Sequence, residues 1–204
     1  MNIKGAKRRP LTVLACVLAA GIIAPAAFAA SWAEGTSGTG DAGELPATAQ
    51  RPSSSLFGPT PFIALDTISG TLSSSTDRDM YRICKLPAGS ASATTVGTPG
   101  TLSDTQLFLF NGSGLGVRAN DDSVGLRSTL PSEVLGWGVY YLAVSTFDSD
   151  PVSVGGLIFP STPFTGVFGP TGPGGGSPIS GWQGLVGTGT YTISLTGWQV
   201  CGIF

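Results

Sequence analysis

The stretch that decides the fold is QLFLFNGSGLGVRA, at residues 106–119. It holds two short apolar runs, 106–110 and 115–119, on either side of Asn111-Gly112. An Asn-Gly pair favours the left-handed backbone of a tight hairpin turn. Leucine and phenylalanine alternate along the first run, and a period of two is typical of a strand. The stretch therefore predicts an antiparallel β-hairpin.

Further runs of the same kind lie on both sides of this hairpin, separated by turn residues. They are residues 67–72, 80–86, 91–96, 127–130, 139–145 and 190–196. None of the chain shows a sustained helical period, and residues 139–144 are apolar throughout, which is typical of a central strand. Short strands at this spacing predict an all-β fold, an antiparallel β-sandwich, as a single domain over residues 59–204.

One long segment, at about residues 150–189, does not fit a regular series of strands. It is rich in Gly and Pro but also carries Phe159, Phe164, Phe168 and Trp182. A loop of this length inside a compact domain is usually functional or disordered. The aromatic residues lead us to expect that parts of it pack onto the sandwich, and a sugar-binding or partner-binding loop is the alternative.

The N-terminus predicts export. Basic residues at positions 4–9 precede an apolar run at 11–23 and small residues up to Ala30, which is the order of a cleavable signal peptide over residues 1–30. We expect cleavage after Ala29 or Ala30. A membrane anchor is the alternative, but the apolar run is shorter than the roughly 20 residues that a spanning helix needs. Lipidation at Cys16 is a further alternative. The predicted location is secreted, either extracellular or periplasmic.

Residues 31–58 are mostly Gly, Ser, Thr, Ala and Pro, with almost no apolar periodicity. Such a composition buries too little apolar surface to offset the entropy of ordering the chain. We therefore expect a flexible leader between the signal peptide and the domain.

Net charge excludes two classes of partner. Removal of the signal peptide takes away four of the ten basic residues and none of the twelve acidic ones, which leaves a net charge of −6. Nucleic acid is not an expected partner, because phosphate binding needs clustered Lys and Arg. An anionic membrane surface is excluded on the same ground, so no membrane contact is expected after signal cleavage.

The two cysteines that remain after signal removal, Cys84 and Cys201, predict a disulfide. An even number of cysteines in an exported chain is typical of bonded pairs. Two buried free thiols are the alternative.

Five short strings resemble the pre-peptidase C-terminal domain family of bacterial secreted proteins. They are DMYRI at 79–83, DTQLFLFNG at 104–112, ANDDS at 119–123, YYLAV at 140–144 and YTISL at 191–195. The resemblance covers about residues 62–197. It implies a sandwich of jelly-roll type that acts as a non-catalytic module, and some relatives bind calcium or an extracellular matrix. No peptidase accompanies the module in this chain, so we expect it to act without one.

The chain has no histidine, which excludes Ser-His-Asp and Cys-His catalysis and most transition-metal sites. Glycosidase-type chemistry needs two carboxyl groups across a cleft, and here aspartates would have to supply them. An extracellular hydrolase that uses aspartates is therefore the catalytic alternative.

Aspartates instead suggest a metal site. If consecutive strands alternate in direction, one end of the sandwich collects seven aspartates: Asp77, Asp79, Asp104, Asp121, Asp122, Asp148 and Asp150. The candidate ligands are Asp77, Asp79, Asp104, Asn120, Asp121 and Asp122. Calcium takes six to eight oxygen ligands of this kind. The strongest local candidate is residues 120–122 facing Asp104. The alternative is that Asp and Asn favour turns for local reasons, with Arg118 and Arg127 neutralising part of the charge.

These observations predict a secreted, non-catalytic β-sandwich module with a binding or accessory role, stabilised by calcium. The expected partner is an extracellular protein or polysaccharide. The alternatives are the aspartate-based hydrolase and a structural component of the cell envelope or matrix.

Overall fold

The computed structural model describes residues 29–36, 40–52, 63–85, 88–185 and 187–202, and every regular element in them is a β-strand. The strands are β1 (Ala29–Ala33), β2 (Ala64–Leu72), β3 (Asp79–Lys85), β4 (Ala91–Thr94), β5 (Gln106–Asn111), β6 (Gly116–Asn120), β7 (Thr129–Glu133), β8 (Gly138–Ser145), β9 (Asp150–Ser153), β10 (Gly156–Leu157), β11 (Val167–Phe168), β12 (Gly181–Gln183), β13 (Gly189–Thr196) and β14 (Trp198–Gln199). Each of the eight runs predicted from the sequence overlaps one of these strands, so the predicted all-β class is confirmed. Within the described ranges, no helix has the length and apolar character needed to cross a membrane.

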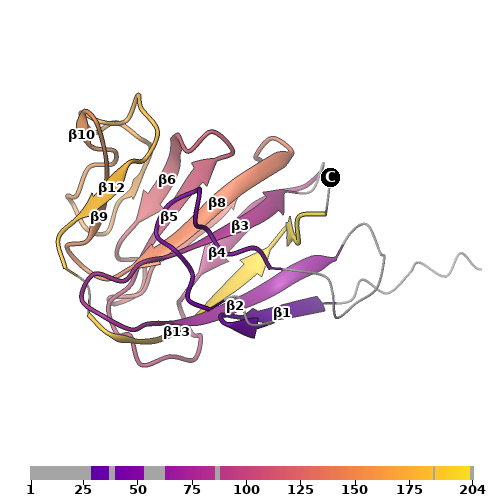
Figure 1. Ribbon diagram of the computed structural model, residues 1–204. Helices are drawn as coiled ribbons and strands as arrows, with labels where there is room; N and C mark the ends of the chain where they lie inside the picture. The colour runs from indigo at the N-terminus through magenta and orange to yellow at the C-terminus, as the bar shows by residue number, and fades with distance from the viewer. Residues whose placement is uncertain (1–28, 37–39, 53–62, 86–87, 186, 203–204) are drawn as a thin grey trace, which may run out of the picture.

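The larger sheet folds back on itself and forms both layers of the sandwich (Figure 1). One layer has the strand order β11-β6-β5-β8-β3, and the other has the order β2-β13-β4-β7 with β1 at the outer edge of β2. β14 pairs with both β2 and β3 and so joins the layers. Neighbouring strands are antiparallel except for the parallel pair β1 and β2. The predicted antiparallel sandwich is therefore confirmed.

The inner faces of the two layers enclose the main hydrophobic core. Alternation along the strands decides which residues enter it, since neighbouring side chains point to opposite faces. The contributions of β3, β5 and β8 are Tyr81, Ile83, Leu107, Leu109, Leu142 and Val144, and those of β2 and β13 include Ile68, Leu72 and Ile193. Burial of each aliphatic side chain of this size contributes about 1.5–3 kcal/mol to stability.

The outer face of β5 and its neighbours is buried as well, by the segment at residues 150–189. Phe108 and Phe110 of β5 form a second core there with Ile158, Phe159 and Ile179 of that segment. The segment also forms a small sheet of its own, in the order β10-β9-β12 (Figure 1). Its expected packing onto the sandwich is thus confirmed, and burial on both faces explains why residues 106–110 are almost wholly apolar.

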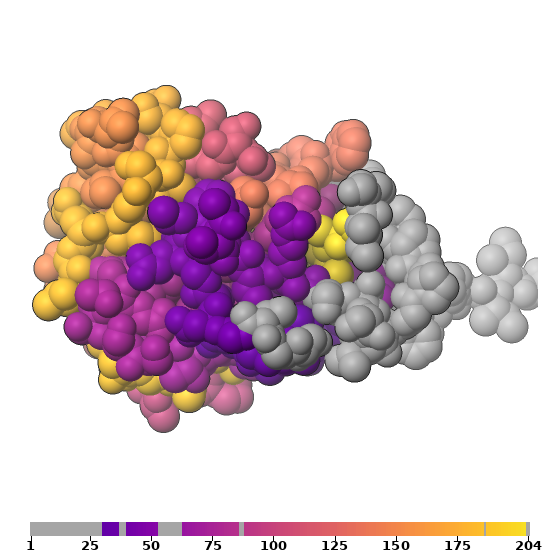
Figure 2. Space-filling view, in the orientation of Figure 1, coloured from indigo at the N-terminus to yellow at the C-terminus, as the bar shows by residue number. Residues whose placement is uncertain are grey.

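The N-terminal segment, which we define as residues 29–36 and 40–52, lies against the sandwich (Figure 2). β1 pairs with β2, and Trp32 is only 5% exposed, with its Nε1 donating to Oε1 of Gln50 at 2.9 Å. The backbone of Gln50 also exchanges hydrogen bonds with Met80 and Arg82 of β3.

These contacts correct the prediction of a flexible leader for residues 31–36 and 40–52. The composition of the segment is poor in apolar residues, but one buried indole and main-chain hydrogen bonds to both layers offset its ordering entropy. Residues 37–39 and 53–58 of the predicted leader lie outside the described residues. The same holds for residues 1–28 of the predicted signal peptide. The predicted cleavage after Ala29 or Ala30 falls at the start of β1.

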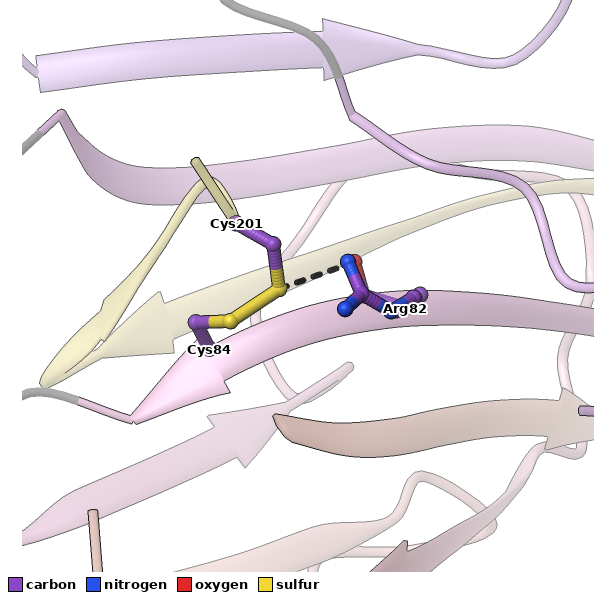
Figure 3. Close-up of a disulfide and its surroundings, with 3 residues drawn as sticks. All are labelled: Arg82, Cys84 and Cys201. Atoms are coloured by element: carbon purple, nitrogen blue, oxygen red, sulfur yellow. Dashed lines mark hydrogen bonds between the residues drawn. A yellow bond between two sulfur atoms is a disulfide. The ribbon is translucent and has the colours of Figure 1, made fainter. Parts of the chain in front are cut away.

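A disulfide joins Cys84 in β3 to Cys201, which follows β14, as the sequence predicted (Figure 3). The two Cα atoms are 5.0 Å apart, within the range that a disulfide spans. Sγ of Cys201 lies 3.9 Å from the carbonyl oxygen of Arg82, which is a contact only, because a disulfide sulfur carries no proton. The bond closes a loop of 117 residues and ties the end of the chain to the layer that contains β3.

Candidate metal-binding site

Three aspartates gather at one end of the β5–β6 hairpin. Asp104 lies two residues before β5, and Asp121 and Asp122 directly follow β6. Because the strands are antiparallel, the start of one and the end of the other meet at the same edge. One carboxylate oxygen from each residue lies within 4.8 Å of the other two. We call Asp104, Asp121 and Asp122 the Asp104 cluster.

Each member of the Asp104 cluster has one oxygen, Oδ1, that is buried without a hydrogen-bond partner. Burial, together with the charges of Asp122, Asp104 and Asp150, raises the pKa of Asp121 to about 7. Burial and the charge of Asp122 also raise the pKa of Asp104. A cation among the three oxygens would satisfy these atoms and offset the repulsion between the carboxylates.

The space beside Asp121 is small, and both polar and apolar residues line it. A cavity of about 10 Å³ is lined there by Asn120, Asp121 and Asp150, with Phe164 among its apolar walls. This is about the volume that the centre of a single water-sized sphere requires. The arrangement therefore has room for one ion or one water molecule next to the cluster.

Asn120, a predicted ligand, positions the cluster instead, because its side-chain oxygen and nitrogen both form hydrogen bonds with backbone groups. Its Oδ1 accepts the N–H of Thr129 at 2.7 Å, and its Nδ2 donates to the carbonyls of Asp122 and Gly166 at 3.0 Å. The N–H of Asp122 in turn donates to the carbonyl of Phe164 at 3.0 Å. The cluster is thereby connected to the segment at residues 150–189.

The arginines near the Asp104 cluster are directed elsewhere. Arg118 forms an ion pair with Glu133, with 2.6 Å between Nη2 and Oε2. Arg127 donates from Nη2 to the carbonyl of Gly100 at 3.4 Å, and its Nη1 is buried without a partner. Among the residues that the structure describes, no ion pair links an arginine to the cluster.

The other two predicted ligands, Asp77 and Asp79, are not part of the Asp104 cluster. Oδ2 of Asp77 accepts the N–H of Ser73 at 2.5 Å, which is the local role that Asp plays in turns. Asp79 begins β3, and its carboxylate lies with those of Glu34 and Asp41 in a separate group. The structure therefore brings together three of the six candidate ligands.

Glu34 and Asp41 were not among the candidate ligands, because both lie in the predicted flexible leader. The one sequence signal that could have drawn attention to them is Trp32, the only large aromatic residue between positions 29 and 56. A tryptophan has a large apolar surface to bury, so its presence in a polar segment suggests that the segment packs against the domain. Its burial, however, depends on partners that are distant in the sequence.

A groove of about 280 Å³ opens beside the Asp104 cluster. Its lining includes Asp104 and Phe147, with threonine, serine and glycine residues making up most of the rest. Phe147 packs edge-on against Phe164, with 5.3 Å between the ring centroids, and the two residues are 46% and 43% exposed. An aromatic pair, hydroxyl groups and a carboxylate thus share one end of the sandwich.

The chain matches no protein-family model and no curated protein sequence.

Proposed function

We propose that the protein is a secreted, non-catalytic β-sandwich module that is stabilised by calcium and binds an extracellular protein or polysaccharide. The observation that carries the proposal is the Asp104 cluster, with its three buried Oδ1 atoms that lack partners. The resemblance to pre-peptidase C-terminal domains supports a non-catalytic role. The disulfide and the signal-peptide pattern support export, since disulfides persist in oxidising compartments.

Asp104, Asp121 and Asp122 would hold the ion. Calcium would supply positive charge that lets three neighbouring carboxylates ionise together, and it accepts the irregular oxygen geometry of loops. The protein's own contribution is to fix the loop after β6, through the hydrogen bonds of Asn120 and through the contact of Asp122 with Phe164. Calcium binding would therefore also order the residues that carry the exposed aromatic pair.

The groove beside Asp104 is the proposed partner-binding surface. Phe147 and Phe164 offer ring faces and edges, and the threonine and serine hydroxyls of the groove offer hydrogen bonds. Partially exposed aromatic rings next to polar groups are common in sites for sugars and for protein partners. Binding of either class at this groove would decrease when Phe147 is replaced by Ala.

The second candidate function is the aspartate-based hydrolase, and the pKa of Asp121 is the observation that favours it. A carboxyl group with a pKa of about 7 can donate a proton near neutral pH, and Asp104 places a second carboxyl group beside it. A cation bound among the three carboxylates would lower this pKa. Substitution of the aspartates in the Asp104 cluster distinguishes the calcium-binding module from the hydrolase.

The test is thermal unfolding of the purified protein in excess calcium and in chelator. An ion at 100 times its dissociation constant adds about 2.7 kcal/mol, or about 5–10 °C in Tm for a domain of this size. The double variant Asp121→Asn/Asp122→Asn should show a smaller calcium-dependent shift than the wild type, whereas Asp148→Asn, an exposed residue at the same end, should keep the full shift. No calcium-dependent shift in the wild type would overturn the calcium part of the proposal, and substrate turnover that the double variant abolishes would favour the hydrolase.

A further inference from the structure

A second group of carboxylates lies where the N-terminal segment meets the sandwich. Glu34 directly follows β1, Asp41 lies in the second part of the segment, and Asp79 is the first residue of β3. One carboxylate oxygen from each lies within 4.8 Å of the other two. We call Glu34, Asp41 and Asp79 the Asp79 cluster.

Asp79 is wholly buried, and one of its two carboxylate oxygens has no hydrogen-bond partner. Its Oδ2 accepts a hydrogen bond from the hydroxyl of Tyr191 at 2.5 Å, and that hydroxyl also lies 2.5 Å from the hydroxyl of Tyr81. Its Oδ1 is buried without any hydrogen-bond partner, and the exposed fraction of the residue is 0%. A buried carboxylate oxygen is normally satisfied, so the orphaned atom itself indicates a missing ligand.

Glu34, a member of the same group, is held in a fixed orientation by two backbone hydrogen bonds. Its Oε1 accepts the N–H of Ala42 at 2.7 Å, and its Oε2 accepts the N–H of Thr71 at 2.8 Å. Gly70 makes the close approach feasible, because a Cβ at this position would lie 2.4 Å from the Tyr191 hydroxyl and 2.8 Å from Oε2 of Glu34. A cleft of about 310 Å³, lined in part by Glu34, Gly70 and Tyr191, opens beside Glu34.

Acidic neighbours and burial dominate the electrostatics of Asp79. Burial and the charges of Glu34, Asp77 and Asp41 raise the pKa of Asp79 to about 9, and Tyr191 opposes this through its hydrogen bond. Among the described residues, no ion pair connects a basic side chain to the cluster. Three carboxylates therefore converge here, and none of them forms an ion pair with a basic residue of the described ranges.

We propose that Glu34, Asp41 and Asp79 bind a divalent cation of the calcium class, and that this ion fastens the N-terminal segment to the sandwich. The site is independent of the Asp104 cluster and of the proposed function. Carboxylate oxygens are the ligands of hard cations, and water entering through the cleft completes the coordination shell. Two ligands come from the segment and one from β3, so the ion crosslinks them.

The crosslink has a consequence for the edge of the sheet. β1 covers the outer hydrogen-bonding edge of β2, and Glu34 donates its own N–H to the carbonyl of Ser69 on that strand. Loss of the ion leaves the carboxylates to repel one another and loosens the segment. The edge of β2 then becomes available for pairing with another strand.

The test is hydrogen exchange of the purified protein, followed by mass spectrometry in calcium chloride and in chelator. Backbone amides of residues 29–52 that exchange only when the segment opens and releases the ion should exchange about 100-fold more slowly in calcium at 100 times its dissociation constant. Asp41→Asn should abolish this protection, and because Asp41 is exposed the variant should fold. Asp79→Asn, which keeps the size of the buried side chain, is the second variant. Glu44→Gln removes a charge from the same segment outside the cluster and should keep the protection.

Three results would overturn the proposal. The first is exchange in this segment that does not depend on calcium in the wild type. The second is protection that Asp41→Asn and Asp79→Asn both retain. The double variant Asp121→Asn/Asp122→Asn distinguishes the two clusters, because protection of residues 29–52 should persist when the Asp104 cluster is removed. Loss of protection in that variant would place the ion at the Asp104 cluster and contradict the proposal.

Discussion

Removal of the disulfide should destabilise the protein mainly through its unfolded state. The bond closes a loop of 117 residues, and the chain-entropy relation assigns about 5 kcal/mol to a loop of this length. Gln199 pairs with Cys84 in the native sheet, so the two ends stay adjacent when the bond is absent. Cys84→Ala/Cys201→Ala should therefore fold to the same structure and unfold at a Tm lower by about 10–20 °C.

Thermal unfolding followed by circular dichroism measures this difference, with the wild type in reductant as the matched control. Both samples should show the same decrease in Tm, because both lose the constraint on the unfolded chain. A decrease of less than about 3 °C would refute the reasoning. It would mean that the unfolded chain keeps its ends close together without the bond.

Three further predictions concern single positions. In chelator, the free energy of unfolding should fall as pH rises from about 4 to about 9, because the pKa of Asp79 is raised to about 9 by burial and acidic neighbours and is about 3.9 when unfolded. Asp79→Asn should flatten this pH profile in urea titrations. Gly70→Ala should lower the free energy of unfolding by about 1–3 kcal/mol in the same assay, since its Cβ would clash with a tyrosine hydroxyl. Gly176→Ala has open space around the new Cβ and should change that free energy by about 0.5 kcal/mol or less. Phe159→Ala should lower the free energy of unfolding by about 3–5 kcal/mol because the ring is buried, and Phe164→Ala should lower it by about 1 kcal/mol or less. Equal decreases would contradict the placement of the two rings.

The central strands could be predicted because their signals are local. Residues 106–119 combine a period of two with an Asn-Gly turn, and β5 and β6 form there. β1 could not be predicted, since its sequence AASWA has one large apolar side chain, Trp32, and the burial of that side chain depends on Gln50 and β2. β9, β10 and β12 are two to four residues long, and packing against the outer face of the sandwich sets them.

The two acidic clusters also differ in whether local sequence signals predict them. Asp104 and residues 121–122 flank one hairpin, so strand direction alone places them at one end of the sheet. The Asp79 cluster joins residues separated by 45 positions in the chain, Glu34 and Asp79, through a segment whose composition favours disorder. Only tertiary contacts bring its members together. Asn120 shows the converse, because its place beside the cluster was predictable and its hydrogen bonds to backbone groups were not.

The most direct test of the calcium-stabilised module is a crystal structure of the protein grown in calcium chloride. The Asp104 cluster should then hold an ion with oxygen ligands from Asp104, Asp121 and Asp122 at about 2.3–2.6 Å. Three carboxylates that remain within 4.8 Å of one another without an ion at saturating calcium would contradict the proposal.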